Sequence, residues 1–187
     1  MARPTRWLKT NSRPLLVSMS FPALLLLLGL PCWWLSPTTG WWSILSWLSL
    51  IAVVFSLIAI PSLLWLLLVP RLSYRSGFLL VYSDYLVPYP VPIDVVECFF
   101  LGNGPSLMAW AGDGEDGPNT NTLVVRLAES QTQWHQKPCR PALGHWCDGY
   151  IVLRGTWCEP LTGELLANLN QWLVEAHRQN KEEAATQ

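Results

Sequence analysis

The sequence predicts a membrane α-helical hairpin followed by an α+β soluble domain. Three observations predict it: a long charge-free apolar stretch, a series of short β-rich runs after that stretch, and an amphipathic helical pattern near the C-terminus. Hydrophobic residues make up 51% of the 187 residues and charged residues only 13%, about half the charged share of an average soluble protein. A chain of this length has room for one ordinary domain, or for a membrane segment plus a domain of about 100 residues, and this composition favours the second.

The apolar stretch covers residues 14–70 and contains no charged residue. A charged side chain at the bilayer centre costs about 2.5–3.5 kcal/mol on insertion scales, so a spanning segment requires this absence of charge. Turn-forming residues at 36–40 divide the stretch, and about 20 residues cross a hydrocarbon core of about 30 Å. We therefore predict a first span over 15–35, a short extracytoplasmic loop over 36–41 and a second span over 42–69. Ser49 and Ser56, seven residues apart, are predicted to be helix-packing contacts.

Positive charge flanks the hairpin on both sides. Four basic residues lie in the segment 1–14, Arg71 and Arg75 follow the second span, and the predicted loop contains no Lys or Arg. The positive-inside rule therefore predicts that both termini are cytoplasmic. Trp7 and Trp65 are candidate markers of the inner membrane boundary, where indole rings are favoured. The alternative is a cleaved signal peptide, which the second full-length apolar segment disfavours.

Short β-rich runs separated by turn residues fill the predicted soluble domain, residues 71–178. They cover 78–82, 85–91, 95–101, 107–110, 122–127 and 150–156, and the third ends at a predicted turn over 102–105. Pro88 and Pro90 lack the N–H that a ladder needs, so the second run is predicted to be an edge strand or to be broken by a bulge. From Pro160 to Ala176 apolar residues recur at spacings of three and four, which predicts one amphipathic helix. The polar tail over 179–187 is predicted to fray.

This order of elements resembles a known family. The residues that carry the resemblance are Arg-Leu-Ser-Tyr-Arg at 71–75, Gly-Phe-Leu-Leu-Val-Tyr at 77–82 and Val-Pro-Ile-Asp-Val-Val-Glu at 91–97. They are similar to bacterial membrane-anchored pleckstrin-homology-like (PH-like) proteins with a two-helix transmembrane hairpin. The resemblance implies an antiparallel β-barrel or sandwich of six to seven strands with one C-terminal helix, in the bacterial cytoplasmic membrane. It implies no catalytic residues, and the long insertion between Thr132 and Gly149 departs from the family.

The charge balance restricts the partners of the soluble domain. From residue 71 onward eight basic residues face thirteen acidic ones, a net charge of −5. Nucleic acid is therefore excluded as the expected partner, because it attracts clustered Lys and Arg. No ionisable residue lies within the predicted spans, which disfavours a transporter. We expect a non-enzymatic binding or assembly module whose partners are the lipid bilayer and another membrane or cytoplasmic protein, or a second copy of the chain.

Two surfaces are candidates for binding. The first is a concave edge strand, which would offer unpaired backbone groups to an incoming peptide. The second is a lipid-proximal pair, Arg71 and Arg75, which would touch lipid headgroups just after the second span. Two charges near the surface contribute only about 1 kcal/mol each, so lipid-headgroup binding is the alternative to protein binding.

One group of residues has the chemistry of metal ligands: His135, Cys139, His145, Cys147 and Cys158. Imidazole and thiolate together suit zinc, and cytoplasmic thiols stay reduced. No Cys-x-x-Cys pair is present, although His145 and Cys147 would share one face of an extended strand. The alternatives are a zinc site, a metal- or thiol-dependent enzyme that uses this region, and loop residues with packed thiols. We favour the last, so we predict no cofactor and no catalytic residue.

Overall fold

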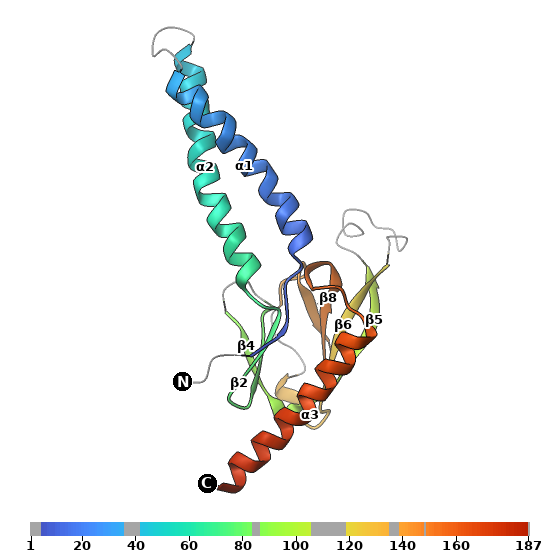
Figure 1. Ribbon diagram of the computed structural model, residues 1–187. Helices are drawn as coiled ribbons and strands as arrows, with labels where there is room; N and C mark the ends of the chain where they lie inside the picture. Colours follow the sequence, from blue (N-terminus) through green and yellow to red (C-terminus); the bar gives the residue numbers. More distant parts are fainter. Residues whose placement is uncertain are drawn as a thin grey trace. The chain divides into compact units, whose positions relative to one another are not determined.

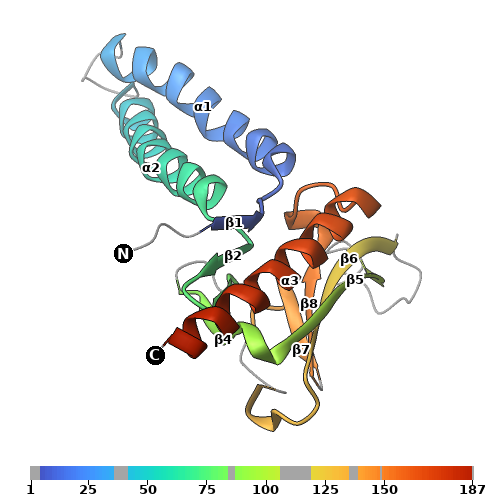
Figure 2. The same ribbon diagram turned by 60° about the horizontal axis from the view of Figure 1, so that its bottom comes forward.

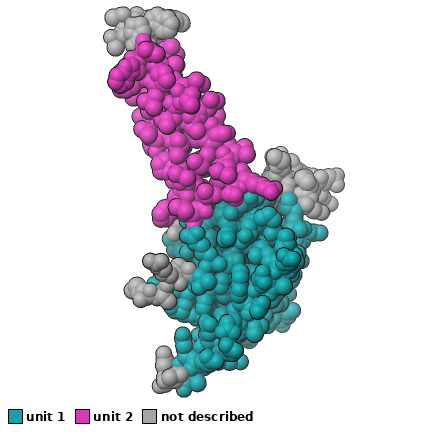
Figure 3. All heavy atoms as spheres, viewed as in Figure 1, with its two compact units in different colours: residues 1–11, 69–187 teal, residues 12–68 magenta. Residues whose placement is uncertain are grey.

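The computed structural model describes residues 5–35, 42–83, 87–105, 119–134, 139–147 and 149–186. The chain divides into two compact units, which Figure 3 colours separately. Unit 2 is residues 12–68, and unit 1 joins residues 1–11 to residues 69–187. The segments before and after the predicted hairpin therefore belong to the same unit.

Unit 2 consists of two long apolar helices, α1 (Ser12–Leu35) and α2 (Trp42–Leu68) (Figure 1). Both helices are long and apolar enough to cross a membrane, which agrees with the two predicted spans. The 24 residues of α1 measure about 36 Å at 1.5 Å per residue. Its start at Ser12 places Pro14 in the first turn, where a missing N–H costs nothing. Helix α2 ends at Leu68 because Pro70 disfavours the helical conformation for the residue before it, Val69.

Small residues bring α1 and α2 into close contact. A Cβ atom on Gly29 would lie 3.1 Å from Val53 Cγ2 and 3.4 Å from the carbonyl oxygen of Ser49. Ser49 and Ser56 are both buried, which confirms their predicted role in helix packing. Their hydroxyl groups donate within α2, to the carbonyls of Ser46 (2.9 Å) and Ala52 (2.8 Å). Close approach of the two helices, rather than hydrogen bonding between them, therefore defines these contacts.

Unit 1 contains two antiparallel four-stranded sheets and a C-terminal helix (Figures 1 and 2). The first sheet has the strand order β1 (Thr5–Leu8), β2 (Leu72–Arg75), β3 (Phe78–Val81) and β4 (Tyr89–Pro92). The second has the order β5 (Val96–Pro105), β6 (Asn119–Leu127), β8 (Tyr150–Arg154) and β7 (Gly144–Cys147). The helix is α3 (Gly163–Thr186). The predicted α+β class is confirmed, with eight strands in the described residues where six or seven were expected.

Most of the predicted strands are present. The runs predicted at 78–82 and 150–156 contain β3 and β8, and those at 95–101 and 122–127 cover parts of the longer strands β5 and β6. The run at 85–91 holds part of β4, which carries Pro90 and forms an edge of its sheet as predicted. The run at 107–110 lies outside the described residues. The turn predicted at 102–105 is wrong, because β5 continues through these residues and pairs with β6 as far as Pro105↔Asn119.

The core of unit 1 lies between the two sheets and α3. Every second residue of β3 and β8 is buried, and the buried stripe of α3 consists of Leu169, Leu173 and Ala176. Alternation with a period of two in strands and a spacing of three and four in α3 directs these side chains to one interior. At the β2–β3 hairpin, Ser76 and Gly77 have φ angles of 47° and 79°, the left-handed pair that a two-residue turn requires.

Helix α3 is longer than predicted. The tail over 179–187 was expected to fray, but the helix continues to Thr186. Arg178 forms ion pairs with Glu175 (3.1 Å) and Glu182 (3.7 Å) at spacings of three and four. Asn180 donates to the carboxylate of Asp94 (2.8 Å), which attaches this part of the helix to the rest of unit 1.

The N-terminal strand β1 was not predicted. Trp7 is only 4% exposed, and its ring stacks on Tyr74 with centroids 5.4 Å apart and meets Phe99 edge-on at 6.1 Å. The prediction that Trp7 marks the membrane boundary is therefore wrong, because the ring fills the core of unit 1. Part of the segment 1–14, expected to be a basic flank, is thus built into a sheet.

The residues after β1 are also attached to unit 1. The backbone N–H of Lys9 donates to the carboxylate of Glu159 (2.8 Å), and the Glu159 N–H donates to the Lys9 carbonyl (3.0 Å). Asn11 N–H donates to the Trp157 carbonyl (3.1 Å), and the Thr10 hydroxyl donates to the carbonyl of Val69 (2.5 Å). Residues 9–11 therefore belong to the hydrogen-bonded structure of unit 1.

Candidate functional site

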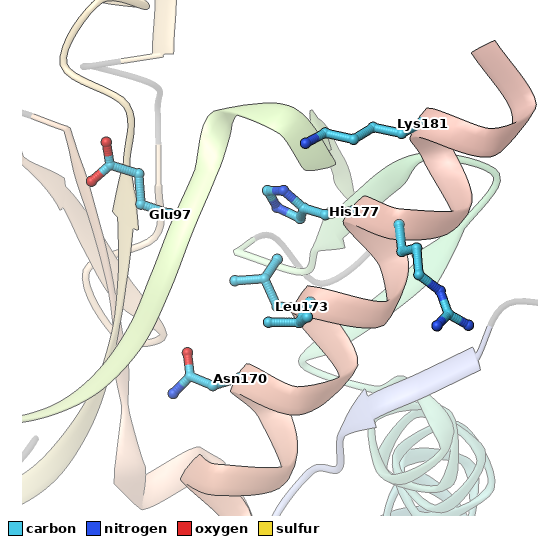
Figure 4. A pocket seen from close by; sticks show the side chains of 7 residues that line it. Glu97, Asn170, Leu173, His177 and Lys181 are labelled. Atoms are coloured by element: carbon cyan, nitrogen blue, oxygen red, sulfur yellow. The ribbon is translucent and has the colours of Figure 1, made fainter. Parts of the chain in front are cut away.

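A groove between β5 and the middle of α3 is the candidate functional site. It has a volume of about 380 Å³ and is lined by Glu97, Asn170, Leu173, Val174, His177, Arg178 and Lys181. Six of these residues come from α3, and their spacings of three, four and seven place them on one side of the helix. Figure 4 shows Asn170, Leu173, His177 and Lys181 extending from α3 toward β5.

Two side chains of α3 bind the backbone of β5 at the edge of its sheet. The Asn170 side-chain oxygen accepts from the Phe99 N–H (2.9 Å), and its NH2 group donates to the Phe99 carbonyl (3.0 Å). The Nε2 atom of His177 is 3.1 Å from the Val96 carbonyl oxygen. Because a carbonyl only accepts, Nε2 carries the proton in this contact. Asn170 thus satisfies both backbone groups of Phe99, as a neighbouring strand would.

These contacts decide how a partner can approach β5. The sequence predicted an edge strand with unpaired backbone groups, but at Phe99 and Val96 the edge of β5 is already hydrogen-bonded to α3. At the edge of the other sheet, β4 contains Pro90 and Pro92, which cannot donate to an added strand. Neither position suits strand addition.

The groove combines an apolar surface with positive charge. Leu173 is buried at its base, whereas Val174 is 71% exposed beside it. Lys181 extends toward β5, while the Glu97 carboxylate is directed away from α3 (Figure 4). Glu97 is instead 2.8 Å from the guanidinium of Arg126. The groove therefore suits a ligand that has an apolar group and a negative charge.

Comparison with known proteins adds no relative. No protein-family model, curated protein or solved structure matches the chain. A function can therefore be proposed only from the geometry and chemistry of the chain itself.

The residues with metal-ligand chemistry are dispersed. His145 and Cys147 are exposed on one face of β7, which confirms that they share a strand face. Cys139 Sγ is 3.9 Å from the Ser83 carbonyl oxygen, and buried Cys158 donates to the Arg154 carbonyl (3.4 Å). Within the described part of the chain, no three His, Cys, Asp or Glu residues are placed to hold a metal ion. His135 lies outside that part.

The two residues of the predicted lipid-proximal pair, Arg71 and Arg75, differ in exposure. Arg71 is 4% exposed, and its Nε donates to the Trp157 carbonyl (3.2 Å), so its side chain is held inside unit 1. Contact with a lipid headgroup requires an exposed guanidinium. Of this pair, only Arg75, at the end of β2, is exposed. This hydrogen bond therefore joins Arg71, which lies between α2 and β2, to the segment that precedes α3.

Sequence reasoning did not identify Asn170 and His177. Both lie next to the apolar stripe of α3, on the flank where its polar residues begin. Their separation of seven residues places them on one helix face, which is the only signal in the sequence. What they contact depends on β5, and no local pattern reveals that pairing.

Because Cys158 is buried, we predict that the free energy of unfolding of unit 1 falls at alkaline pH. Burial raises the pKa of this thiol from 9.0 to about 12. Between pH 9 and 12 the unfolded chain loses this proton, whereas the folded protein keeps it. The contribution of the protonated thiol to the free energy of unfolding is therefore complete below pH 9 and is lost as the pH rises toward 12. We expect Cys158 to lower the free energy of unfolding by up to about 1.4 kcal/mol per pH unit in this window. Denaturant unfolding at a series of pH values measures it.

The control for this prediction is Cys158→Ala, which removes the titrating group. Other groups that ionise above pH 9 contribute equally to both proteins, so the difference between their slopes isolates the thiol. Identical slopes for the wild type and Cys158→Ala would contradict the prediction.

Proposed function

We propose that this chain is a membrane-anchored, non-enzymatic binding module whose unit 1 has a PH-like fold and faces the cytoplasm. The observation that carries the proposal is the pairing of β1, which precedes α1, with β2, which follows α2. Their antiparallel register is Thr5↔Tyr74, Arg6↔Ser73 and Leu8↔Leu72. Two adjacent strands of one sheet lie on one side of a membrane, so α1 starts and α2 ends on that side.

Charge supports the cytoplasmic side. The segment 1–14 and the residues just after α2 contain Lys and Arg, whereas residues 36–41 between the helices contain none. Basic flanks are retained in the cytoplasm by the positive-inside bias. Two antiparallel sheets followed by a single C-terminal helix are compatible with the PH-like resemblance.

The β5–α3 groove is the proposed binding surface of this module. Its partner is an amphipathic segment of another protein, with an apolar side chain on Leu173 and Val174 and an acidic group near Lys181. Because Asn170 and His177 already satisfy the β5 backbone at two positions, the partner docks through side chains. Apolar side chains with a few polar groups around them are typical of concave binding sites.

Photo-crosslinking tests the groove in native membranes. A photoreactive amino acid at Val174, in the full-length chain, is expected to give a discrete crosslink to one other protein. Adding Lys181→Glu is expected to reduce the yield at least about tenfold, because reversing the charge of a close pair costs more than 1.4 kcal/mol. Gel mobility followed by mass spectrometry of the crosslinked species is the measurement.

A photoreactive residue at Asn168 is the matched control. Asn168 is exposed on the same helix, but it is not among the residues that line the groove. The same crosslinks from both positions, or none from Val174, would reject docking in the groove. If Val174 crosslinked only to a second copy of the chain, the groove would serve self-association and not the binding of another protein.

A further inference from the structure

A hollow of unit 1 is bounded by β1 and α3, with one residue of β2 beside them. It has a volume of about 180 Å³ and is lined by Thr5, Arg6, Trp7, Tyr74, Trp172, Glu175, Ala176 and Gln179. None of these residues lines the β5–α3 groove, so the two sites are separate. The volume is below the roughly 300 Å³ at which drug-sized pockets begin, so the hollow suits a small ligand.

Three aromatic rings form a wall of this hollow. Trp7 stacks on Tyr74 with centroids 5.4 Å apart, and it meets Trp172 at 6.3 Å with an interplanar angle of 41°. Trp7 is 4% exposed and Trp172 is 40% exposed, so Trp172 offers most of its ring surface to a ligand. The electron-rich face of an indole attracts cations, and quaternary ammonium groups are recognised in this way.

Two charged side chains, Arg6 and Glu175, also line the hollow. Arg6 is exposed, and its guanidinium has no hydrogen bond or ion pair within the described part of the chain. The Oε1 atom of Glu175 accepts from Arg178 (3.1 Å) and Gln179 (3.3 Å). Its Oε2 atom has no partner among the residues that the structure describes, and an exposed ion pair such as that with Arg178 is weak. Both side chains can therefore bind a ligand.

A ligand with a single charge fits this arrangement poorly. A cation that approached Glu175 would also meet Arg6, and an anion that approached Arg6 would also meet Glu175, because both side chains line one small hollow. A ligand with one positive and one negative group is complementary to both.

We propose that this hollow binds a small zwitterion in which an alkylammonium group and a phosphate ester are joined by a short linker. The ammonium group lies against the Trp172 ring beside Glu175, and the phosphate binds the Arg6 guanidinium through paired hydrogen bonds. The Thr5 hydroxyl is a further donor to the phosphate. The headgroup of a zwitterionic phospholipid and a free phosphate ester share this chemistry.

Fluorine NMR on the full-length protein tests the proposal in a maltoside detergent, which contains neither ammonium nor phosphate. The protein is labelled with 5-fluorotryptophan, and the Trp172 signal is assigned by Trp172→Phe. With phosphocholine as the probe, we expect a saturable shift of this signal with a dissociation constant on the order of 1 mM. Choline, which lacks the phosphate, and methyl phosphate, which lacks the ammonium, are each expected to bind at least about tenfold more weakly.

Two variants separate the roles of the two charges. Arg6→Gln is expected to weaken phosphocholine binding at least about tenfold and to leave choline binding no weaker than in the wild type. Glu175→Gln is expected to weaken the binding of both compounds, because both contain the ammonium group. Arg75→Gln and Glu164→Gln are the matched controls, since both residues are exposed and neither lines the hollow.

Vesicles distinguish the two sources of the ligand. The Trp172 signal is compared between phosphatidylcholine and phosphatidylglycerol vesicles without soluble ligand. A difference that Glu175→Gln abolishes identifies a lipid headgroup, whereas a response to soluble phosphocholine alone identifies a free phosphate ester.

Three results would overturn the proposal. They are the absence of both responses, equal affinity of the wild type for choline and phosphocholine, and binding of phosphocholine by Arg6→Gln and Glu175→Gln as tight as by the wild type. None of these results depends on the β5–α3 groove, so the proposed protein-binding function stands or falls separately.

Discussion

Replacing Trp7 by alanine is expected to lower the free energy of unfolding of unit 1 by about 3–5 kcal/mol. The indole is 4% exposed and contacts Tyr74, Phe99 and Trp172, with ring centroids 5.4, 6.1 and 6.3 Å away. Removal of the ring leaves a cavity where β1 meets the rest of the core, and it loses the aromatic contacts as well. Denaturant unfolding of the full-length protein in detergent, followed by near-UV circular dichroism, measures the change.

Trp34→Ala is the control for this variant. Trp34 lies in α1 and is 81% exposed, so its removal is expected to leave the stability of unit 1 unchanged. Trp7→Phe keeps an aromatic ring and is expected to cost less than Trp7→Ala. If Trp7 were a membrane anchor, Trp7→Ala would change membrane partition and leave the unfolding of unit 1 at the wild-type value.

Replacing Gly29 by leucine is expected to disrupt the packing of α1 against α2. Even a Cβ atom at this position would lie 3.1 Å from Val53 Cγ2 and 3.4 Å from the Ser49 carbonyl oxygen. A leucine side chain therefore forces the helices apart, and overpacking of this kind costs about 1–3 kcal/mol. Titration with sodium dodecyl sulfate, with helix separation followed by fluorescence energy transfer between labels on α1 and α2, measures the effect.

Ala23→Leu provides the matched control, since it adds the same side chain at an exposed position of α1. We expect Ala23→Leu to behave like the wild type and Gly29→Ala to fall between the two leucine variants. A Gly29→Leu protein with wild-type resistance to the detergent would show that the helices do not pack through this glycine.

The elements that could be predicted from the sequence are those with a strong local pattern. A charge-free stretch over 14–70 permits little except apolar helices, and the spacing of apolar residues after Pro160 identifies α3. Strand β1 lacks such a pattern. Its four residues, Thr-Arg-Trp-Leu, become a strand only because they pair with β2, which lies beyond both helices in the sequence. The basic residues around them resemble the flank of a membrane span, and this local signal misassigned Trp7.

The candidate sites show the same limit. His145 and Cys147 share a face of β7 because alternation in a strand is a local property. The role of Asn170 depends on a neighbour from another element, namely the Phe99 backbone. Gly102 and Gly104 favoured a turn by composition, whereas in the structure they lie in β5 and pair with Thr122 and Thr120 of β6. Residue types were visible in the sequence, but their cross-strand partners were not.

The position of β1 in the chain also sets the order of assembly. During synthesis β1 leaves the ribosome first, and it has no partner until α1, α2 and then β2 have followed. If α1 and α2 span the membrane as proposed, the first sheet closes only after both helices are inserted and β2 has returned to the side that holds β1. On that proposal, a chain whose first helix is inserted in the wrong direction would leave Trp7 across the membrane from Tyr74, and the first sheet would not form.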